Sequence, residues 1–490
     1  MNKMSYFYKI LNIKNMDYNQ NELNPHLIEK YLQKSANEFT KEDLIKFIVE
    51  NEIEMLNFRY MAEDGRLKTL NFVINSIDHL DTILSTGERV DGSSLFSFLG
   101  AASSDLYVIP RYSTAFVNPF EEIPTVDILC SYYDFEGKPL ESSSEYILRK
   151  AHKEFKRATG FTFKALGELE YYIIGTKDCN ESFIAKDQRG YHESTPYTKF
   201  EFLRRQAMKY IAACGGKIKY GHAEVGNFTD DNFYYEQQEI EFLPCKAESA
   251  ADQLLIARWV LERLCFDYGV EVNFAPKLTD GKAGSGMHIH MMLEKDGQNM
   301  LVENNKLSDI AKKMIAGILD LADALTAFGN RTADSYRRLV PNQEAPTEIC
   351  WGDRNRSVLV RVPLGWTAGT NMVNDANPQE KTVLQIKTSK QTFEIRSGDC
   401  TAELYLYMAA LIVASQHGLE MPNALEIAEK LYVNVNIHKA ENADKLKSLK
   451  GLPINCSDSA DRLNAKREYF EKNNIFSKGL IDNTIKFLKK

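Results

Sequence analysis

Three apolar runs of this chain each carry two polar side chains spaced two residues apart. The pairs are Glu168 with Glu170, His288 with His290, and Glu394 with Arg396. Successive side chains of a β-strand point to opposite faces, so the two members of each pair share a face. The pattern predicts three strands that bring carboxylates, imidazoles and a guanidinium to one place.

Burying these groups without partners would be costly. An unpaired charge in a low-dielectric interior costs on the order of several kcal/mol. Divalent cations and an anionic substrate would offset that cost. Any single pair is also compatible with the solvent face of an edge strand. Three pairs in equally apolar strands favour a shared site.

The first part of the chain predicts a small sheet-plus-helix domain over residues 41–118. Thr40 is a plausible N-cap, with Asp43 at the third helical position and an apolar stripe after it. Strand-like runs at residues 54–60 and 68–74 flank the turn signal EDGR. Residues 1–40 form an N-terminal extension without a clear pattern.

Residues 119–490 alternate strand-like and helical patterns, which predicts one mixed α/β unit whose sheet collects the paired residues. We assign to it the strands 126–135 and 164–174 and the helices 144–158 and 251–269. Residues 404–414 are too short to span a bilayer and predict a buried helix. The tail from residue 423 is mostly helical, with a break expected at Pro453 and residues 455–462.

Composition narrows the class of protein. The 490 residues are 44% hydrophobic and 26% charged, with a net charge of -8 and no basic run, which argues against a nucleic-acid partner. Eight cysteines without a CxxC pair predict reduced thiols in a cytoplasmic protein. The N-terminus is too polar for a signal-peptide core, and we expect no membrane partner.

Several sequence motifs resemble those of a known protein family. They are GSGMHIH at residues 284–290, SYRRLVPNQEAP at 335–346, RNRSVLVRVP at 354–363, FEIRSGD at 393–399, and DGSS at 91–94 followed by SSD at 103–105. In these segments and their order, the chain resembles the glutamine synthetase family, in its bacterial type I-like form, over roughly residues 45–485.

The resemblance implies an α+β fold, with an N-terminal β-grasp domain and a catalytic domain whose curved antiparallel sheet forms half of a barrel. It implies ATP-dependent amide formation from glutamate and ammonia through γ-glutamyl phosphate, with two Mg²⁺ or Mn²⁺ ions. It also implies a homo-oligomeric ring, most simply a dodecamer of two stacked hexamers.

The reaction of the family explains why metal ligands are needed. A carboxylate is a poor acyl donor, so ATP must first convert it to an acyl phosphate, and phosphoryl transfer needs cations around the moving charge. By resemblance, Glu170, Glu224 and Glu239 hold one ion. Glu168, His288 and Glu394 hold the second. Glu239 alone would be compatible with a surface carboxylate, but Gln237 and Glu239 match the family's Q-x-E.

Cationic residues supply the anion sites, because a guanidinium stays charged and offers a rigid fork of donors. By resemblance, Arg338 and Arg396 bind the glutamate carboxylates, and Gly284 lets the backbone approach the substrate. Arg356 and Arg361 stabilise the transferred phosphoryl group. His290 either contacts ATP or supports His288. Lys390 is assigned to ATP, since Thr392 stands where the family commonly has arginine.

Ammonium must lose a proton before it attacks, and anionic groups can bind it and accept that proton. By resemblance, this site comprises Asp91, Ser94, Tyr191, Glu224 and Glu344, with Asp91 on the small domain of one subunit and the metal-binding strands on its neighbour. Glu344 would lie on a flap that excludes water from the acyl phosphate. The alternative for Asp91 is that it only caps the DGSS turn.

The chain also departs from the family pattern. Ala283 replaces an asparagine, residues 227–235 are an insertion, and Tyr432 matches a regulatory tyrosine of some relatives poorly. We expect a glutamate–ammonia ligase. Two alternatives stay open: a γ-glutamyl ligase for another amine, and a non-catalytic structural homologue. Loss of metal ligands would favour the second, and all six candidates are present.

Overall fold

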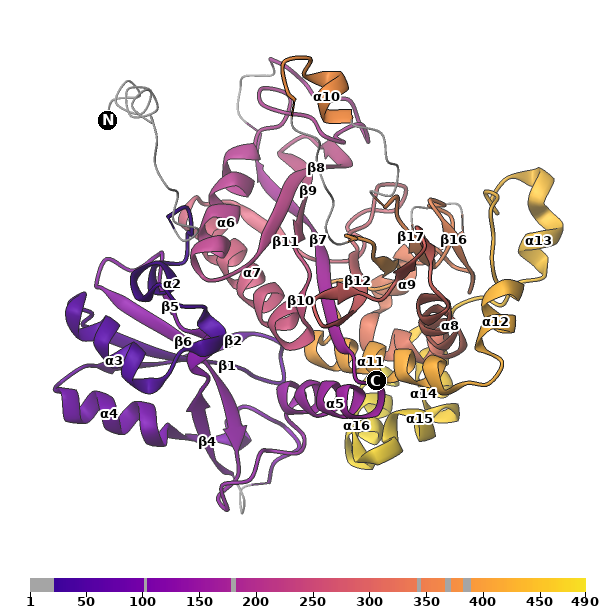
Figure 1. The fold of residues 1–490 in the computed structure, drawn as a ribbon. Helices are drawn as coiled ribbons and strands as arrows, with labels where there is room; N and C mark the ends of the chain where they lie inside the picture. The colour runs from indigo at the N-terminus through magenta and orange to yellow at the C-terminus, as the bar shows by residue number, and fades with distance from the viewer. Residues whose placement is uncertain (1–21, 101–103, 178–181, 342–344, 366–371, 382–388) are drawn as a thin grey trace.

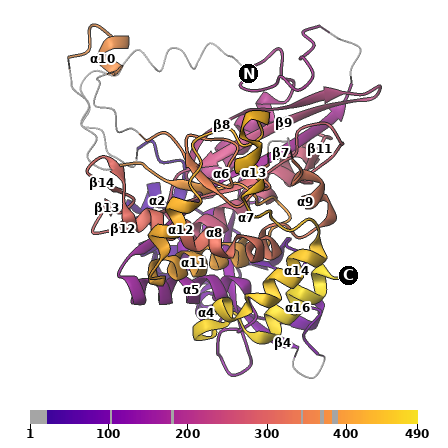
Figure 2. The same ribbon diagram turned by 90° about the vertical axis from the view of Figure 1, so that its right-hand side faces the viewer.

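The structure is a computed structural model that describes residues 22–100, 104–177, 182–341, 345–365, 372–381 and 389–490. It contains a smaller N-terminal sheet and a larger sheet that lie side by side (Figure 1). Helices α5, α8 and α11 lie below the larger sheet, as Figure 2 shows from a second side. The fold is α+β, as the resemblance implied.

The smaller sheet has the strand order β2-β1-β6-β4-β3. Its strands are β1 (Met55–Met61), β2 (Leu67–Val73), β3 (Glu88–Asp91), β4 (Asp105–Pro110), β5 (Phe116–Val117) and β6 (Thr125–Tyr133), and its helices are α2 (Leu27–Leu32), α3 (Lys41–Glu50) and α4 (Ile77–Thr86). The predicted capping box of α3 is confirmed: the Asp43 N–H donates to Thr40 Oγ1, and the Thr40 N–H donates to Asp43 Oδ2.

Strand β6 corrects one assignment. The sequence placed residues 126–135 in the larger sheet, but β6 pairs in parallel with β1 and antiparallel with β4. A salt bridge of 2.7 Å from Arg59 to Asp127 joins β1 to β6 in the interior. A strand that is buried along its whole length has the same apolar pattern in either sheet, so the pattern alone could not assign it.

The larger sheet has the order β16-β17-β18-β12-β7-β9-β8 and forms the half-barrel. These strands are β7 (Thr162–Thr176), β8 (Ile218–Thr229), β9 (Phe233–Phe242), β12 (Met287–Lys295), β16 (Trp351–Asp353), β17 (Val360–Val362) and β18 (Phe393–Ile395). The short strands β10 (Cys245–Lys246) and β11 (Glu271–Asn273) pair with β7, and β13 (Gln298–Asn299) pairs with β12. Neighbours are antiparallel except β16 and β17.

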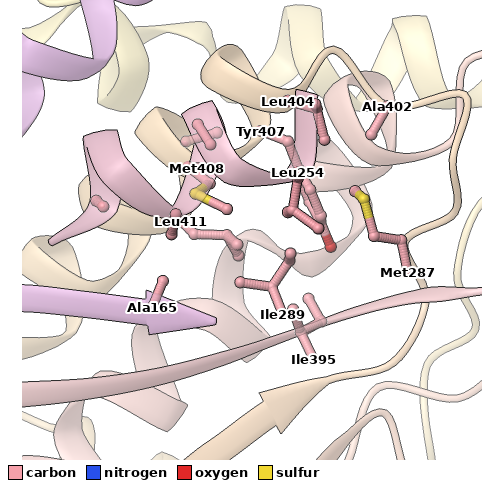
Figure 3. Packing of buried hydrophobic residues seen from close by; sticks show 14 of the residues in the cluster. Ala165, Leu254, Met287, Ile289, Ile395, Ala402, Leu404, Tyr407, Met408 and Leu411 are labelled. Carbon is pink, nitrogen blue, oxygen red and sulfur yellow. The ribbon is translucent and has the colours of Figure 1, made fainter. Parts of the chain in front are cut away.

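Helices bury one face of this sheet. They include α5 (Ser144–Thr159), α6 (Glu201–Ala213), α7 (Ala247–Asp267), α8 (Asp309–Gly329) and α11 (Leu404–Glu420). Figure 3 shows Ala165 and Ile289 of the sheet directed toward side chains of α11 such as Met408. A Cβ added to Gly167 would lie 2.8 Å from the Leu254 side chain of α7. Since Gly167 faces the helices, Glu168 and Glu170 face the other way.

The remaining segments are helical. They comprise α9 (Ala333–Arg338), α10 (Met372–Ala376), α12 (Ala424–Lys430), α13 (Ala443–Lys447), α14 (Cys456–Ala465), α15 (Arg467–Glu471) and α16 (Lys478–Leu488), besides the hairpin β14 (Val302–Glu303) and β15 (Lys306–Leu307). The break expected at Pro453 is confirmed, since it lies between α13 and α14, but its extension over residues 455–462 is wrong. Asn455 caps α14 there by accepting the Asp458 N–H at 2.8 Å, so its polar residues begin a helix.

Three further observations concern the described residues. The apolar run from residue 404 is the buried helix α11, as predicted. Within the described ranges, no helix is long and apolar enough to cross a membrane. The seven cysteines that the structure describes are all free thiols, six of them buried.

Candidate active site

A cavity of about 1280 Å³ opens on the face of the larger sheet that the helices leave uncovered. Its two walls differ in charge. One wall carries carboxylates of β7, β8 and β9, namely Glu168, Glu170, Glu224, Glu239 and Glu241. The other carries the cations Arg338, Arg356, Arg361, Lys390 and Arg396, while Lys164, Lys219 and Lys277 also line the cavity. The arrangement can hold positive ions on one side and an anionic substrate on the other.

The register of the strands explains why these groups lie on one face of the sheet. His288 is paired with Glu168 across β12 and β7, and Glu394 is paired with both His290 and Arg361. Residues directly opposite each other in a sheet point to the same face. The prediction that three strands share a site is therefore confirmed for their placement.

One group of possible metal donors comprises Glu168, His290 and Glu394. The Nε2 atom of His290 lies 2.8 Å from Glu168 Oε1 and 2.6 Å from Glu394 Oε2. Burial alone lowers the pKa of His290, but the two carboxylates raise it to about 10. Imidazolium here neutralises charge that would otherwise be buried unpaired.

A single proton on Nε2 does not satisfy both carboxylates. It donates to Glu168 Oε1, and Glu394 Oε2 is buried without a hydrogen bond of acceptable geometry despite its short distance. The side chain of Glu394 is only 1% exposed. A divalent cation between these oxygens would satisfy both, so the donor set fits Mg²⁺ or Mn²⁺.

The other oxygen of Glu394 faces the cationic wall. Its Oε1 lies 2.9 Å from Arg361 Nη1 and 3.6 Å from Arg396 Nε. Burial and the neighbouring Glu168 raise the pKa of Glu394, but the imidazolium of His290 prevails and lowers it to about 2. Glu394 thus stays ionised and links the two walls.

His288 lies between the two glutamates of β7. Its Nδ1 is 2.7 Å from Glu168 Oε2, and its Nε2 is 3.8 Å from Glu170 Oε1. Glu170 Oε2 accepts the Gly286 N–H at 2.6 Å and the Gln237 amide at 3.3 Å. These bonds fix the orientation of Glu170 toward the cavity.

A second donor group comprises His222, Glu224 and Glu239, whose ligand atoms lie within 4.8 Å of one another. A β-bulge in β8 follows Ala223 and carries Glu224, and bulges re-aim side chains in this way. Burial, then repulsion from four neighbouring glutamates, raises the pKa of Glu239 well above its usual range. A cation would relieve this repulsion.

Two residues of this wall were missed from the sequence. His222 precedes Glu224 by two positions, and Glu241 follows Glu239 by two. Both have the spacing that singled out the other pairs, so the same rule would have found them. Glu241 forms a salt bridge of 2.6 Å with Lys219.

The predicted residues fall into three sets. The cavity is lined by Glu168, Glu170, Glu224, Glu239, His288, Glu394, His290, Tyr191, Gly284, Arg338, Arg356, Arg361, Lys390 and Arg396. Asp91 and Ser94 do not line it; they lie on the turn after β3 in the small domain. Glu344 lies outside the described residues.

Asp91 does cap its turn. Its carboxylate accepts the Ser93 N–H at 3.0 Å and the Ser94 hydroxyl at 2.8 Å. Hydrogen bonds from the Ser93 and Ser94 side chains lower the pKa of Asp91. The capping role is therefore present, and an additional role in binding ammonium stays a prediction.

Comparison with known proteins identifies the family. The model of the glutamine synthetase catalytic domain matches residues 141–489, and that of the glutamine synthetase β-grasp domain matches residues 52–135. The chain belongs to the glutamine synthetase family. The suspected resemblance is confirmed, together with its two-domain fold.

Relatives of this glutamine synthetase family member are distant but cover nearly its whole length. Glutamine synthetase of Clostridium saccharobutylicum is 28% identical over 450 residues, which are 91% of this chain and 92% of that protein. Glutamine synthetase of Mycolicibacterium smegmatis is 26% identical over 486 residues, with 92% and 95% covered.

Two solved structures share the fold. Plasmodium falciparum glutamine synthetase has a TM-score of 0.74 at 20% identity, covering 92% of this chain and 95% of that chain. A GmaS/ADP complex has a TM-score of 0.70 at 17% identity, covering 91% and 94%. At these identities, the likeness establishes the architecture and leaves the substrate to the residues of the site.

The glycine segment of this family member packs tightly against Arg338. A Cβ on Gly284 would lie 2.5 Å from Pro276 O, and one on Gly286 would lie 2.4 Å from Arg338 Nη2. Arg338 Nη1 donates to the backbone carbonyls of Ser397 at 2.8 Å and Gly398 at 3.2 Å. The guanidinium is thereby fixed beside the segment where a substrate carboxylate is expected.

The residues that depart from the family pattern make specific contacts in the structure. The backbone of Ala283 is held by Gln188 at 2.7 Å and by the Tyr172 hydroxyl at 2.8 Å. Thr392 Oγ1 lies 2.8 Å from His290 Nδ1 and so positions the imidazole. The inserted residues 227–235 extend the β8–β9 hairpin, where Phe228 and Tyr235 stack at 4.3 Å.

Proposed function

We propose that the protein ligates ammonia to the γ-carboxylate of L-glutamate through γ-glutamyl phosphate, giving glutamine, ADP and phosphate from ATP. The observation that carries this proposal is that one cavity is lined both by a cluster of carboxylates and imidazoles and by several guanidinium groups. Family membership supports a glutamine synthetase-type ligase in general. The proposal extends that to the particular reaction.

Mg²⁺ or Mn²⁺ would be held by the donor groups of the acidic wall. The ligands proposed for one ion are Glu170, Glu224 and Glu239, and those for the other are Glu168, His288 and Glu394. Bound there, the ions would neutralise charge on the phosphates of ATP. The buried, unsatisfied Oε2 of Glu394 and the mutual repulsion around Glu239 support the fit.

The cationic wall would bind the anions. Arg338 and Arg396 are proposed to bind the carboxylates of glutamate, while Arg356 and Arg361 would stabilise the transferred phosphoryl group. Lys390 and His290 are the candidates for contact with ATP. Guanidinium groups suit these roles because they stay charged and offer paired donors at fixed angles.

For the second step, we propose that Glu224 and Tyr191 bind ammonium and that Glu224 helps to accept its proton. Asp91 and Ser94 would complete this site from a neighbouring subunit, because they are exposed and lie outside the cavity of their own chain. Glu344 would close it as a flap. A head-to-tail ring, most simply a dodecamer of two hexamers, provides such shared sites.

A mixing experiment tests the shared site. Asp91→Asn and Arg396→Ala should each be nearly inactive alone. Co-expressed, they should recover about a quarter of the sites if subunits combine at random in a ring. Mixed rings that form normally and recover no activity would show that each site is built within one chain.

A second candidate is a γ-glutamyl ligase for an organic amine. It is favoured by aromatic rings beside Glu224, because such rings attract alkylammonium groups. Tyr191 stacks on His192 at 4.2 Å and contacts His222 edge-on at 5.3 Å. A non-catalytic homologue has less support, since all six predicted ligands line the cavity.

Phosphate release from ATP in the presence of glutamate distinguishes these candidates. Ammonium should give the highest kcat/KM, with methylamine, ethylamine and larger amines at least tenfold lower. An organic amine that exceeds ammonium would establish the second candidate. No glutamate-dependent release with any acceptor would contradict both. We expect the enzyme in the cytoplasm, where its buried thiols stay reduced.

A further inference from the structure

His222 faces the acidic wall but has no assigned role. It lies on β8 directly opposite Glu239 of β9, and its side chain is 13% exposed. Its Nε2 atom is 3.9 Å from Glu239 Oε2, too far for a hydrogen bond. The two donor atoms instead flank a space that a cation would fill.

The other ring nitrogen determines which tautomer the neutral imidazole adopts. Nδ1 lies 3.0 Å from the backbone carbonyl of Ala223, which only accepts hydrogen bonds. Nδ1 therefore carries the proton, and Nε2 presents a lone pair toward Glu239. Imidazoles that ligate metals are oriented in this way, with the second nitrogen donating to a carbonyl or carboxylate.

Neighbouring rings hold the imidazole plane. His192 lies 4.3 Å from His222 between ring centroids, and Tyr191 contacts it edge-on at 5.3 Å. Because rings on this side restrict its rotation, the lone pair keeps its direction. A ligand with a fixed orientation loses little entropy when it binds an ion.

Glu239 provides an independent indication of a ligand. Its side chain is only 9% exposed. Among the described residues, no side chain or backbone N–H donates a hydrogen bond to it. A cation between this carboxylate, the lone pair of His222 and the second carboxylate, Glu224, would compensate the buried negative charge.

We propose that His222 is a ligand of the same ion as Glu224 and Glu239. The imidazole nitrogen would shift the preference of this site from Mg²⁺ toward transition metals such as Mn²⁺ and Co²⁺, which bind nitrogen more strongly. The inference rests on the proposed metal dependence but not on which amine is ligated.

Ion binding tests this role without an activity assay. Mn²⁺ is titrated into the full-length protein, and free Mn²⁺ is counted by electron paramagnetic resonance. The wild type should bind two ions per chain. His222→Leu should bind one, with the second weakened more than about tenfold, because loss of even an outer partner of a ligand costs about 10- to 100-fold.

His222→Gln is the more discriminating variant, because it replaces the imidazole nitrogen with the amide oxygen of glutamine as the ligand. It should retain Mg²⁺ affinity within about threefold and lose the preference for Mn²⁺. The visible spectrum of bound Co²⁺ should change in the same variant. His79→Gln, on α4 of the small domain, is the matched control and should bind both ions as the wild type does.

The outcomes separate this proposal from the proposed function. Wild-type stoichiometry and Mn²⁺ preference in both His222 variants would overturn the role of His222, even if ammonium-dependent turnover is normal. Absence of ligation with intact, His222-dependent ion binding would overturn only the proposed reaction. Thermal melting without metal verifies that each variant is folded.

Discussion

The two faces of the larger sheet are made by the same strands but differ in the chemistry of their side chains. On the helix-covered face, Ala165, Ile289 and Ile395 pack against α7 and α11 with almost no exposed surface. On the other face, His290 and Glu394 are also nearly buried and Glu168 is half-buried, yet Glu394 Oε2 has no hydrogen-bond partner. The first face stabilises the fold, and the second presents charged groups that can bind ligands.

The largest effect should come from placing the chemistry of one face on the other. Ile289→Asp puts an unpaired carboxylate among the side chains of α11, which costs on the order of 4 kcal/mol or more. We expect little soluble protein and no cooperative unfolding transition. Ile289→Val is the matched control, costing about 1 kcal/mol. A melting temperature within a few degrees of the wild type for Ile289→Asp would contradict the comparison.

Substitution on the cavity face should separate activity from stability. Arg396→Ala removes a guanidinium proposed to bind a glutamate carboxylate and should lower kcat/KM for glutamate by about 100-fold or more, because hydrogen bonds to charged groups contribute about 1.5–3 kcal/mol each. Its secondary structure by circular dichroism should be unchanged. Arg337→Ala is the control, since Arg337 pairs with Asp334 and Asp280 at the exposed surface and should stay fully active. Comparable activities of the two variants would place the chemistry elsewhere.

A smaller effect should be a gain in stability rather than a loss. Glu239→Gln relieves the repulsion around a buried carboxylate, so it should stabilise the metal-free protein by about 1 kcal/mol. The same change should reduce the rise in melting temperature on adding Mn²⁺. Differential scanning fluorimetry with and without metal measures both. A destabilised metal-free variant would mean that Glu239 already has a partner that stabilises its charge.

Strand periodicity predicted the cavity face well, because the alternation of side chains depends only on local geometry. It placed Glu168, His288 and Glu394 together before any contact was known. It did not indicate that His290 Nε2 would lie between Glu168 and Glu394, because that depends on side-chain rotamers and on Thr392. Such detail arises from packing between distant segments.

Other failures have equally physical causes. The strand β6 is buried throughout, so its sequence did not reveal which sheet it joins. The polar run at residues 455–462 was taken for a break, although Asn455 followed by Asp458 is a capping pattern. The β-bulge that re-aims Glu224 does not follow from local pattern either.

Removing the metal tests the central claim most directly, namely that the charged face of the sheet is a metal-dependent ligase site. Glutamate- and ammonium-dependent phosphate release from ATP is followed after treatment with a chelator and on re-addition of single ions. We predict that activity disappears, returns with Mg²⁺ or Mn²⁺, and does not return with Ca²⁺, whose longer and looser coordination would misplace the phosphates. Undiminished turnover in the presence of chelator would contradict the account.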